Sequence, residues 1–323
     1  MSEFQNSEKE IKMIALDLDG TTLTKRGLTA RTKRALENAI ANGVHVVIAT
    51  GRTFTALPKD IFSIKGLQYV VTSNGAQITD LKKETVIYSN CIAKDRIHFV
   101  SKLLEERGFP IEVFTEGKAY VDETVYQELK QHGSNFMNAE YVLRTRIPVS
   151  RIYDFMLSHD NVIENINIHF EFLKEKIEMK QVLEQLEGIT VTSSFPHNLE
   201  IGGATTSKAT GLAALCDRLA LSMEQVMACG DSPNDIAMIR AAGLGIAMGN
   251  GEEEVKRAAD YIGPGNEEEG VAYVVEKFVL KSCPEKTVAL HHAKNTALNI
   301  TYSAAKGCYK RLIRRPKQIR NKE

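Results

Sequence analysis

Apolar residues in the first third of the chain form short uninterrupted runs, and a helical pattern separates the first two. One run begins after Lys12 and ends at Asp17, and two others span residues 44–50 and 67–72. The helical pattern covers residues 29–42, with a threonine at its cap position. Apolar runs of this length are typical of parallel strands that are buried on both faces.

The same rhythm resumes in the last third of the chain. Helical patterns are present at residues 207–220, 235–242 and 252–259, and short apolar runs at 226–230 and 244–248 lie between them. Alternation of strand and helix predicts a parallel sheet with helices on both faces. We therefore expect an α/β fold with a doubly wound, Rossmann-like parallel-sheet core.

The middle of the chain has a different pattern. Charged residues are dense, short runs such as IEVFTEG and VIENINIHFEF indicate strands, and helical spacing is present at 97–107 and 173–186. These elements predict an inserted α+β domain whose antiparallel sheet faces water on one side. The expected order is the first part of the core, the inserted domain, the second part of the core and a C-terminal extension, at residues 1–83, 84–195, 196–280 and 281–323.

Two carboxylates stand directly after the first apolar run. Asp17 and Asp19 are followed by Gly20, Thr21 and Thr22. Open α/β sheets place their ligands at the carboxyl ends of the strands, and two acids this close need a cation or a proton to coexist. Acids that merely cap the strand end are the plain alternative. A calcium loop of the EF-hand type fits poorly, because its glycine stands sixth whereas Gly20 stands fourth.

Other ends of the predicted core elements also carry polar groups. Thr50 ends the second strand, Lys208 opens a helix, and Asp231 and Asp235 follow a later strand. Each has an ordinary reading as a strand end, a surface charge or a helix cap. Parallel strands end at one edge of the sheet, so together these groups are expected to converge on Asp17.

Such a cluster suits a phosphate monoester, whose negative charge must be offset before a carboxylate can approach. Mg²⁺ prefers oxygen ligands and fits Asp17, Asp231 and a backbone carbonyl, while Lys208 and Thr50 are suitable donors to phosphate. Asp17 can then attack phosphorus to give an aspartyl-phosphate. Asp19 can protonate the leaving alkoxide and later activate water.

Four segments in this order resemble the signatures of the haloacid dehalogenase (HAD) superfamily of phosphatases. They are DLDGT at 17–21, IATGR at 48–52, SKATGL at 207–212 and GDSPND at 230–235. The resemblance implies a nucleophile and an acid/base, phosphate or substrate ligands, Mg²⁺ ligands and a residue supporting the metal shell. By this resemblance, Asp17 would be the nucleophile and Asp19 the acid/base. The phosphate or substrate ligands would be Leu18, Thr50, Gly51, Lys208 and Asn234. The Mg²⁺ ligands would be Asp17, Asp231 and the main-chain carbonyl of Asp19, and Asp235 would support the metal shell.

The position of the insertion narrows the resemblance. Asp19 and Thr50 are about thirty residues apart, whereas more than 150 residues separate Thr50 from Lys208. The chain is therefore similar to the Cof-type subgroup, which carries a C2 cap, and SNGAQI at 73–78 and NLEI at 198–201 are similar to that subgroup as well. The resemblance covers residues 11–280, and it departs at Ala209, where glycine commonly follows the lysine.

The function that we expect is Mg²⁺-dependent hydrolysis of a small phosphorylated metabolite, a sugar phosphate or similar, through an aspartyl-phosphate. Nucleotide-like phosphates and pyridoxal phosphate remain open as substrates. One alternative is a regulatory or binding protein on a HAD scaffold that uses the basic tail as its partner site. Another is a phosphomutase, which would return the phosphoryl group to its substrate.

Charge is balanced over the chain but unevenly distributed. The chain has 41 basic and 41 acidic residues, and the extension 281–323 carries eleven of the former and two of the latter. The rest of the chain is therefore net negative, at −9, beside a tail of +9. A solvated tail is the simplest reading, and an amphipathic contact with anionic lipid or nucleic acid is the alternative.

Cysteine usage and hydropathy bear on the location of the protein. The five cysteines are scattered and form no CxxC pair, which is typical of reduced thiols in the cytoplasm. Cys216 and Cys229 stand in apolar runs and are expected in the core. The polar N-terminus lacks the apolar stretch of a secretory signal, and no apolar run is long enough to span a membrane.

Overall fold

The computed structural model describes residues 10–282, and residues 10–281 belong to one compact unit. The predicted extension 281–323 therefore lies outside the described residues, apart from its first two positions. Within the described part, no helix is both long and apolar enough to cross a membrane. The cytoplasmic location stays a prediction.

The core is an eight-stranded sheet with the order β14-β13-β12-β1-β2-β3-β4-β5. The pairs from β14 to β3 are parallel, and β4 and β5 are added to that edge as antiparallel strands. The strands are β1 Met13–Leu16, β2 His45–Ala49, β3 Tyr69–Thr72, β4 Gln77–Asp80, β5 Thr85–Ser89, β12 Val226–Gly230, β13 Leu244–Ala247 and β14 Tyr261–Ile262.

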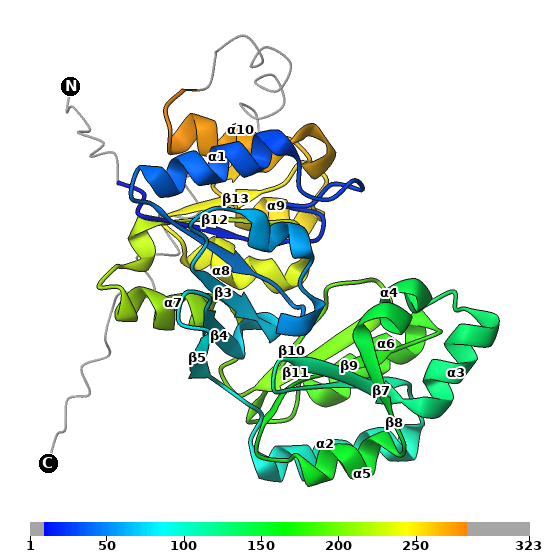
Figure 1. The fold of residues 1–323 in the computed structure, drawn as a ribbon. Coiled ribbons are helices and arrows are strands. Elements are labelled where there is room, and N and C mark those ends of the chain that lie inside the picture. The colour runs from blue at the N-terminus through cyan, green and yellow to red at the C-terminus, as the bar shows by residue number, and fades with distance from the viewer. Residues whose placement is uncertain (1–9, 283–323) are drawn as a thin grey trace, which may run out of the picture. The chain divides into compact units, whose positions relative to one another are not determined.

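Helices cover both faces of this sheet, as the apolar runs predicted (Figure 1). On one face, Met13 and Ala15 of β1 pack with Leu212 and Leu215 of α7, and the alternate residues Ile14 and Leu16 are equally buried. Helices α1 and α10 pack together over the other face. The core helices are α1 Ala30–Ala41, α7 Lys208–Arg218, α8 Ile236–Ala241, α9 Glu253–Ala258 and α10 Gly270–Phe278. The α/β core is confirmed.

Local signals determine where the core helices begin. The hydroxyl of Thr29 accepts the backbone N–H of Thr32 at the start of α1, and Ser207 with Thr210 forms a capping box at the start of α7. Short 3₁₀ helices connect the other elements: η1 Phe54–Ala56, η2 Lys59–Ser63, η3 Ser73–Gly75, η4 Met223–Gln225, η5 Pro233–Asp235 and η6 Asn266–Glu268. Cys216 and Cys229 are buried in the core, as predicted.

The inserted part forms a second sheet with the order β10-β11-β9-β6-β7-β8. All its pairs are antiparallel except β7 with β8. Its strands are β6 Ile111–Thr115, β7 Lys118–Asp122, β8 Arg146–Val149, β9 Ile163–His169, β10 Ile189–Thr192 and β11 Asn198–Gly203. Its helices are α2 Lys94–Arg107, α3 Glu123–His132, α4 Ala139–Thr145, α5 Ile152–Ser158 and α6 Leu173–Leu183.

The two faces of the second sheet differ sharply in polarity. Alternate residues such as Val113, Ile166 and Ile168 pack against helices α2, α5 and α6. The residues between them, such as Glu112 and Asn167, point to the opposite face, yet their side chains are buried. The prediction that this face meets water was therefore wrong. Its polar residues line a pocket instead, so the alternation reflects a binding surface rather than a solvated one.

The predicted limits of the insertion, 84–195, do not coincide with the points at which the chain passes from one sheet to the other. Strand β5 pairs with β4 in the core sheet, although the insertion was expected to begin at 84. Strand β11, which was expected in the core, pairs with β9 and β10 in the second sheet. Antiparallel hairpins need no crossover, so these strands join the sheet of their neighbours in sequence. The division into domains stays a prediction.

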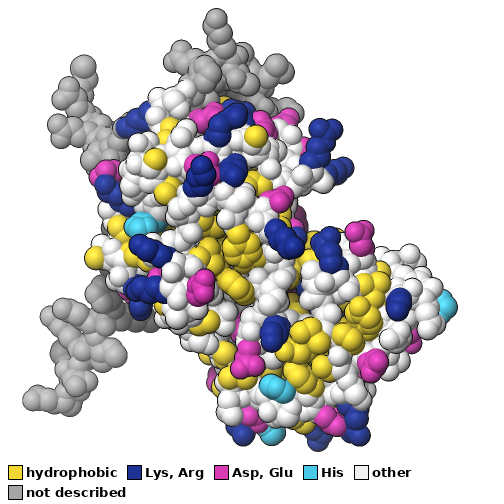
Figure 2. Space-filling model, in the orientation of Figure 1, with side chains coloured by type: hydrophobic (Ala, Val, Ile, Leu, Met, Phe, Trp, Pro, Cys, Tyr) yellow, Lys and Arg dark blue, Asp and Glu magenta, His cyan; other side chains and the backbone are white. Residues whose placement is uncertain are grey.

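Charged side chains of both signs are interspersed on the face shown in Figure 2. On that face, within residues 10–282, no broad basic patch is formed. Nucleic-acid binding usually relies on such a patch. The predicted contact with anionic lipid or nucleic acid concerns the tail 281–323, which lies outside the described residues apart from its first two positions.

A buried carboxylate joins the two sheets. Glu164 of β9 accepts hydrogen bonds from the hydroxyl of Ser73, from the amide of Gln77 at 3.2 Å and from the backbone N–H of Gly117 at 2.7 Å. Ser73 and Gln77 belong to the core, whereas Glu164 and Gly117 belong to the insertion. Burial raises the pKa of Glu164, although the hydrogen bond from Ser73 opposes this shift.

Replacing Glu164 by glutamine should raise the free energy of unfolding at neutral pH. When folding raises the pKa of a carboxyl group, that group lowers the free energy of unfolding as the pH rises above its pKa in the unfolded chain, which is about 4. The glutamine amide keeps one acceptor oxygen and removes the buried charge. The gain of Glu164→Gln should thus be present near pH 8 and shrink toward about pH 4. Urea unfolding across this range is the measurement, with the exposed Glu106→Gln as control, and parallel curves for the two variants would contradict the prediction.

Candidate active site

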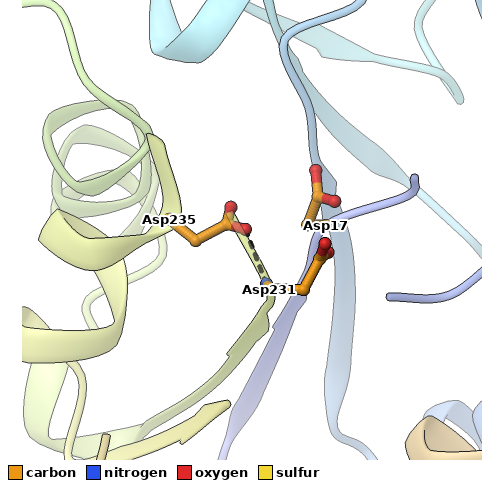
Figure 3. Close-up of side chains that lie close together, drawn as sticks. All are labelled: Asp17, Asp231 and Asp235. Atoms are coloured by element: carbon orange, nitrogen blue, oxygen red, sulfur yellow. Dashed lines mark hydrogen bonds between the residues drawn. The ribbon is translucent and has the colours of Figure 1, made fainter. Parts of the chain in front are cut away.

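Three acidic residues from two distant parts of the chain meet at the carboxyl edge of the core sheet. Asp17 follows β1, Asp231 follows β12 and Asp235 ends η5, and Figure 3 shows their carboxylates pointing toward one another. One oxygen of each lies within 4.8 Å of the others. The convergence that parallel strands imply is thus present in the structure.

Lys208 joins this cluster from the first turn of α7. Its Nζ lies 2.6 Å from Oδ1 of Asp17 and 2.7 Å from Oδ1 of Asp235, and its side chain is completely buried. Burial lowers the pKa of this ammonium group, but the two carboxylates outweigh burial and hold the pKa above its ordinary value. Lys208 is therefore a permanent cation beneath the site.

Asp231 is held by hydroxyl groups rather than by the lysine. Thr21 donates to its Oδ1 at 2.6 Å, and Ser232 donates to its Oδ2 at 3.1 Å. Gly20 has a positive φ of 76°, and a Cβ built there would lie 2.4 Å from Oδ2 of Asp231. The loop after β1 can approach Asp231 this closely only because residue 20 has no side chain.

The charges of the cluster are not balanced. Burial raises the pKa of Asp17 well above its ordinary value, against the opposing charge of Lys208. Burial also raises the pKa of Asp231, to about 6. Three carboxylates thus share one ammonium group, and the carboxylate oxygens are donors of the kind that hard divalent cations prefer. The residues present fit a metal ion.

Asp235 is suited to support such a site rather than to hold an ion itself. Its Oδ1 binds Lys208, and its Oδ2 accepts the backbone N–H groups of Asp231 at 2.9 Å and Ser232 at 3.0 Å (Figure 3 shows the first of these). These hydrogen bonds fix the backbone that carries Asp231. The predicted role of Asp235 in supporting the metal shell stays a prediction.

The predicted phosphate-binding residues lie around the same edge. Thr50 and Gly51 follow β2 and line the pocket, and Asn234 of η5 donates to Oδ1 of Asn74 at 3.0 Å. The side chain of Leu18 is fully buried, so only its main chain can face a ligand. The roles of these residues stay a prediction.

Asp19 lies apart from the three-carboxylate cluster. Arg52 binds its carboxylate in a bidentate manner, with hydrogen bonds from Nε to Oδ2 at 2.7 Å and from Nη2 to Oδ1 at 2.6 Å. The Asp19 side chain is 41% exposed, so it faces the pocket. Sequence reasoning missed this role of Arg52, although the arginine stands in the IATGR segment directly after Gly51.

Asn74 is a second residue that sequence reasoning left without a role. It adopts a left-handed conformation with φ of 56°, and its amide donates to Glu200 of β11 at 2.6 Å. Its Oδ1 accepts the hydrogen bond from Asn234. Asn74 therefore connects the second sheet to Asn234 at the carboxyl edge of the core sheet, and the SNGAQI segment was the signal that could have indicated it.

A pocket of about 830 Å³ lies over the carboxylates, between residues of both sheets. Asp17, Asp19 and Asp231 line it from the core sheet, and the second sheet contributes its buried polar face. The polar residues from that sheet are Glu112, Arg146, Asn167, His169, Asn198 and Glu200. Aromatic side chains from loops and from helix α4 complete the wall, namely Phe136, Tyr141 and Phe195. The site can therefore enclose a small polar molecule against the acidic cluster.

Comparisons with known proteins place this site in a family. The family model of haloacid dehalogenase-like hydrolases matches residues 14–275. The 5-amino-6-(5-phospho-D-ribitylamino)uracil phosphatase YcsE of Bacillus subtilis is 33% identical over 279 residues, which are 85% of this chain and 99% of that protein. Phosphatase YwpJ of the same organism is 32% identical over 284 residues, covering 82% and 99%.

A solved structure shows the same fold. The structure of a haloacid dehalogenase-like hydrolase from B. subtilis matches with a TM-score of 0.70 at 29% identity, covering 82% of this chain and 99% of that one. The predicted resemblance is therefore confirmed over the core and the inserted α+β cap. The chain belongs to the haloacid dehalogenase-like hydrolases as a Cof-type member, a phosphoric monoester hydrolase that acts on small phosphorylated substrates.

Proposed function

We propose that this chain is a Mg²⁺-dependent phosphatase that hydrolyses a sugar phosphate or a similarly polar phosphorylated metabolite through an aspartyl-phosphate. The observation that carries the proposal is the contact of 2.6 Å between the buried ammonium of Lys208 and Asp17, beside Asp231 at the floor of the pocket. A nucleophilic carboxylate can face a phosphate dianion only where neighbouring cations offset the repulsion.

Asp17 is the proposed nucleophile. Lys208 holds one of its oxygens, which fixes the carboxylate and leaves the second oxygen to attack phosphorus in line with the leaving group. The new bond joins this oxygen to phosphorus, and the bond from phosphorus to the ester oxygen breaks. Thr50, Asn234, Lys208 and the main chain of Leu18 and Gly51 are the proposed ligands of the phosphoryl oxygens.

Asp19 is the proposed acid and base. In its protonated form it gives a proton to the departing alkoxide. In the second step the resulting carboxylate takes a proton from the water that hydrolyses the aspartyl-phosphate, which regenerates the acid. Its exposed carboxylate lines the pocket, where a leaving group can reach it. Arg52 orients both of its oxygens.

Asp17, Asp231 and the main-chain carbonyl of Asp19 would hold Mg²⁺, and Asp235 would support that shell. When bound there, the ion would neutralise part of the charge that the phosphate and the carboxylates share. The excess of carboxylates over ammonium groups supports this assignment. The oxygen-only donor set favours Mg²⁺ over softer metals.

The polar face of the cap supports a polar leaving group. Buried hydrogen-bonding groups favour ligands that pair with them and disfavour apolar ones. Relatives are named for different substrates. One is a 5-amino-6-(5-phospho-D-ribitylamino)uracil phosphatase. Another, which is 28% identical over 281 residues, is the Pyridoxal phosphate phosphatase YbhA of Escherichia coli. The alternative of a binding protein that uses the 281–323 tail concerns residues outside the described part and stays a prediction.

Asp17→Asn should abolish phosphate release, since an amide oxygen is a far weaker nucleophile than a carboxylate. We expect kcat/KM for 4-nitrophenyl phosphate to fall by roughly 10³-fold or more. The exposed Asp217→Asn is the matched control and should behave as the wild type does. Retention of activity in Asp17→Asn would remove this residue as the nucleophile.

Chelation of divalent metal should abolish activity, and added Mg²⁺ should restore it. Asp231→Asn removes a charged ligand, so the Mg²⁺ concentration for half-maximal activity should rise by about tenfold or more. A Mg²⁺ titration of wild type, Asp231→Asn and Asp217→Asn measures this. Full activity of the wild type in excess chelator would contradict the metal requirement while leaving Asp17 as the nucleophile.

A further inference from the structure

One aromatic ring of the cap contacts two arginines, one from the core and one from the cap. The guanidinium of Arg52, from the core, lies 4.9 Å from the centre of the Tyr141 ring. The guanidinium of Arg146, from the cap, lies 4.6 Å from the centre of the same ring. Each guanidinium also binds a carboxylate, Arg52 to Asp19 and Arg146 to Glu112. The result is a continuous array from a buried acid of the cap to the proposed acid/base of the core.

The cap end of this array is rigid. Glu112 and Arg146 form an ion pair of 2.8 Å, and both side chains are almost fully buried. Asn167 donates to the same oxygen of Glu112 at 2.9 Å, and Arg146 also lies 5.3 Å from the Phe114 ring centre. A buried charge pair with these additional contacts has few alternative positions.

Tyr141 itself is held by its own helix. The side chain of Asn138 caps α4 and accepts the backbone N–H of Tyr141 at 3.1 Å. The next residue, Val142, packs into an apolar cluster with Leu129 and Met137. The backbone that carries the Tyr141 ring is therefore fixed within the cap.

The core end of the array is less constrained. Asp19 is 41% exposed and has rotatable bonds, so its position depends on its partner Arg52. Arg52 in turn is fixed by three groups, namely Asp19, the carbonyl of Ala56 at 3.0 Å and the face of Tyr141. The tyrosine is the partner that comes from the cap.

We propose that Tyr141 is a positioning residue that, through Arg52, holds Asp19 where it can protonate the leaving group. The inference rests on the proposed function, in which Asp19 is the acid. It assigns to the cap a part in the chemistry that is distinct from contact with substrate. An arginine held against an aromatic ring is more ordered than one free in water, and proton transfer needs a donor within hydrogen-bond reach.

The test compares two aryl phosphate esters whose leaving groups differ in their need for an acid. The 4-nitrophenolate ion leaves readily without a proton, whereas phenolate is a poorer leaving group and depends more on the acid. For the full-length Tyr141→Leu enzyme with Mg²⁺, the ratio of kcat/KM for phenyl phosphate to that for 4-nitrophenyl phosphate should fall by about three- to thirtyfold. A purely structural role would lower both values alike and leave the ratio unchanged, which would overturn the inference.

Two variants separate the ring from general damage to the cap. Tyr141→Phe retains the aromatic face and should keep the wild-type ratio. Tyr126→Leu makes the same change in α3, where the hydroxyl donates to the carbonyl of Leu143 and the ring packs beside α4. It should also keep the wild-type ratio. A lowered ratio in Tyr126→Leu equal to that in Tyr141→Leu would overturn the inference.

A double-mutant cycle with Asp19→Asn completes the test. If Tyr141 acts through Asp19, adding Tyr141→Leu to Asp19→Asn should not lower the ratio any further. An equal further decrease would overturn the inference while leaving the proposed function intact. A wild type inactive toward both esters would overturn the proposed function instead, and the inference with it.

Discussion

The rest of the site depends on one buried ammonium group. Lys208 has no exposed surface, and a buried charge is stable only when it is paired. Its two partners, Asp17 and Asp235, come from opposite sides of the insertion in the sequence. The ion cluster therefore ties the two parts of the core together at the point where phosphate is expected to bind. Folding of the core and assembly of the reactive edge are consequently one event, because neither carboxylate can be buried beside the other without this cation.

Polar contacts join the cap to this edge. Glu164 binds Ser73, and Glu200 binds Asn74, within a loop of left-handed backbone that also reaches Asn234. Hydrogen bonds of this kind are directional, so they fix position more than they add affinity. The loop between β3 and β4 is thereby a junction at which the cap, the carboxyl edge and the core sheet meet.

The sequence was sufficient for the parts of the structure that follow from burial and strand direction. Apolar runs identified β1, β2 and β12 because those strands are covered on both faces, and parallel order brought Asp17, Lys208 and Asp231 to one edge. The short elements α4 and β8 escaped prediction, since seven and four residues carry too little periodicity. The stacking of Tyr141 on Arg52 depends on how the cap folds over the core, which no local pattern records.

Alternate residues of the cap strands serve two different purposes, since one set stabilises the sheet and the other lines the pocket. Residues such as Val113, Ile166 and Leu199 belong to the apolar interior, while their neighbours Glu112, Asn167 and Asn198 face the pocket. Neighbouring positions on one strand are thus under unrelated constraints. The pocket-facing residues can change during evolution so that the pocket binds a different substrate. The interior residues meanwhile keep the sheet folded, and the reactive carboxylates of the core do not change. Diversity of substrates among related enzymes is what such an arrangement would permit.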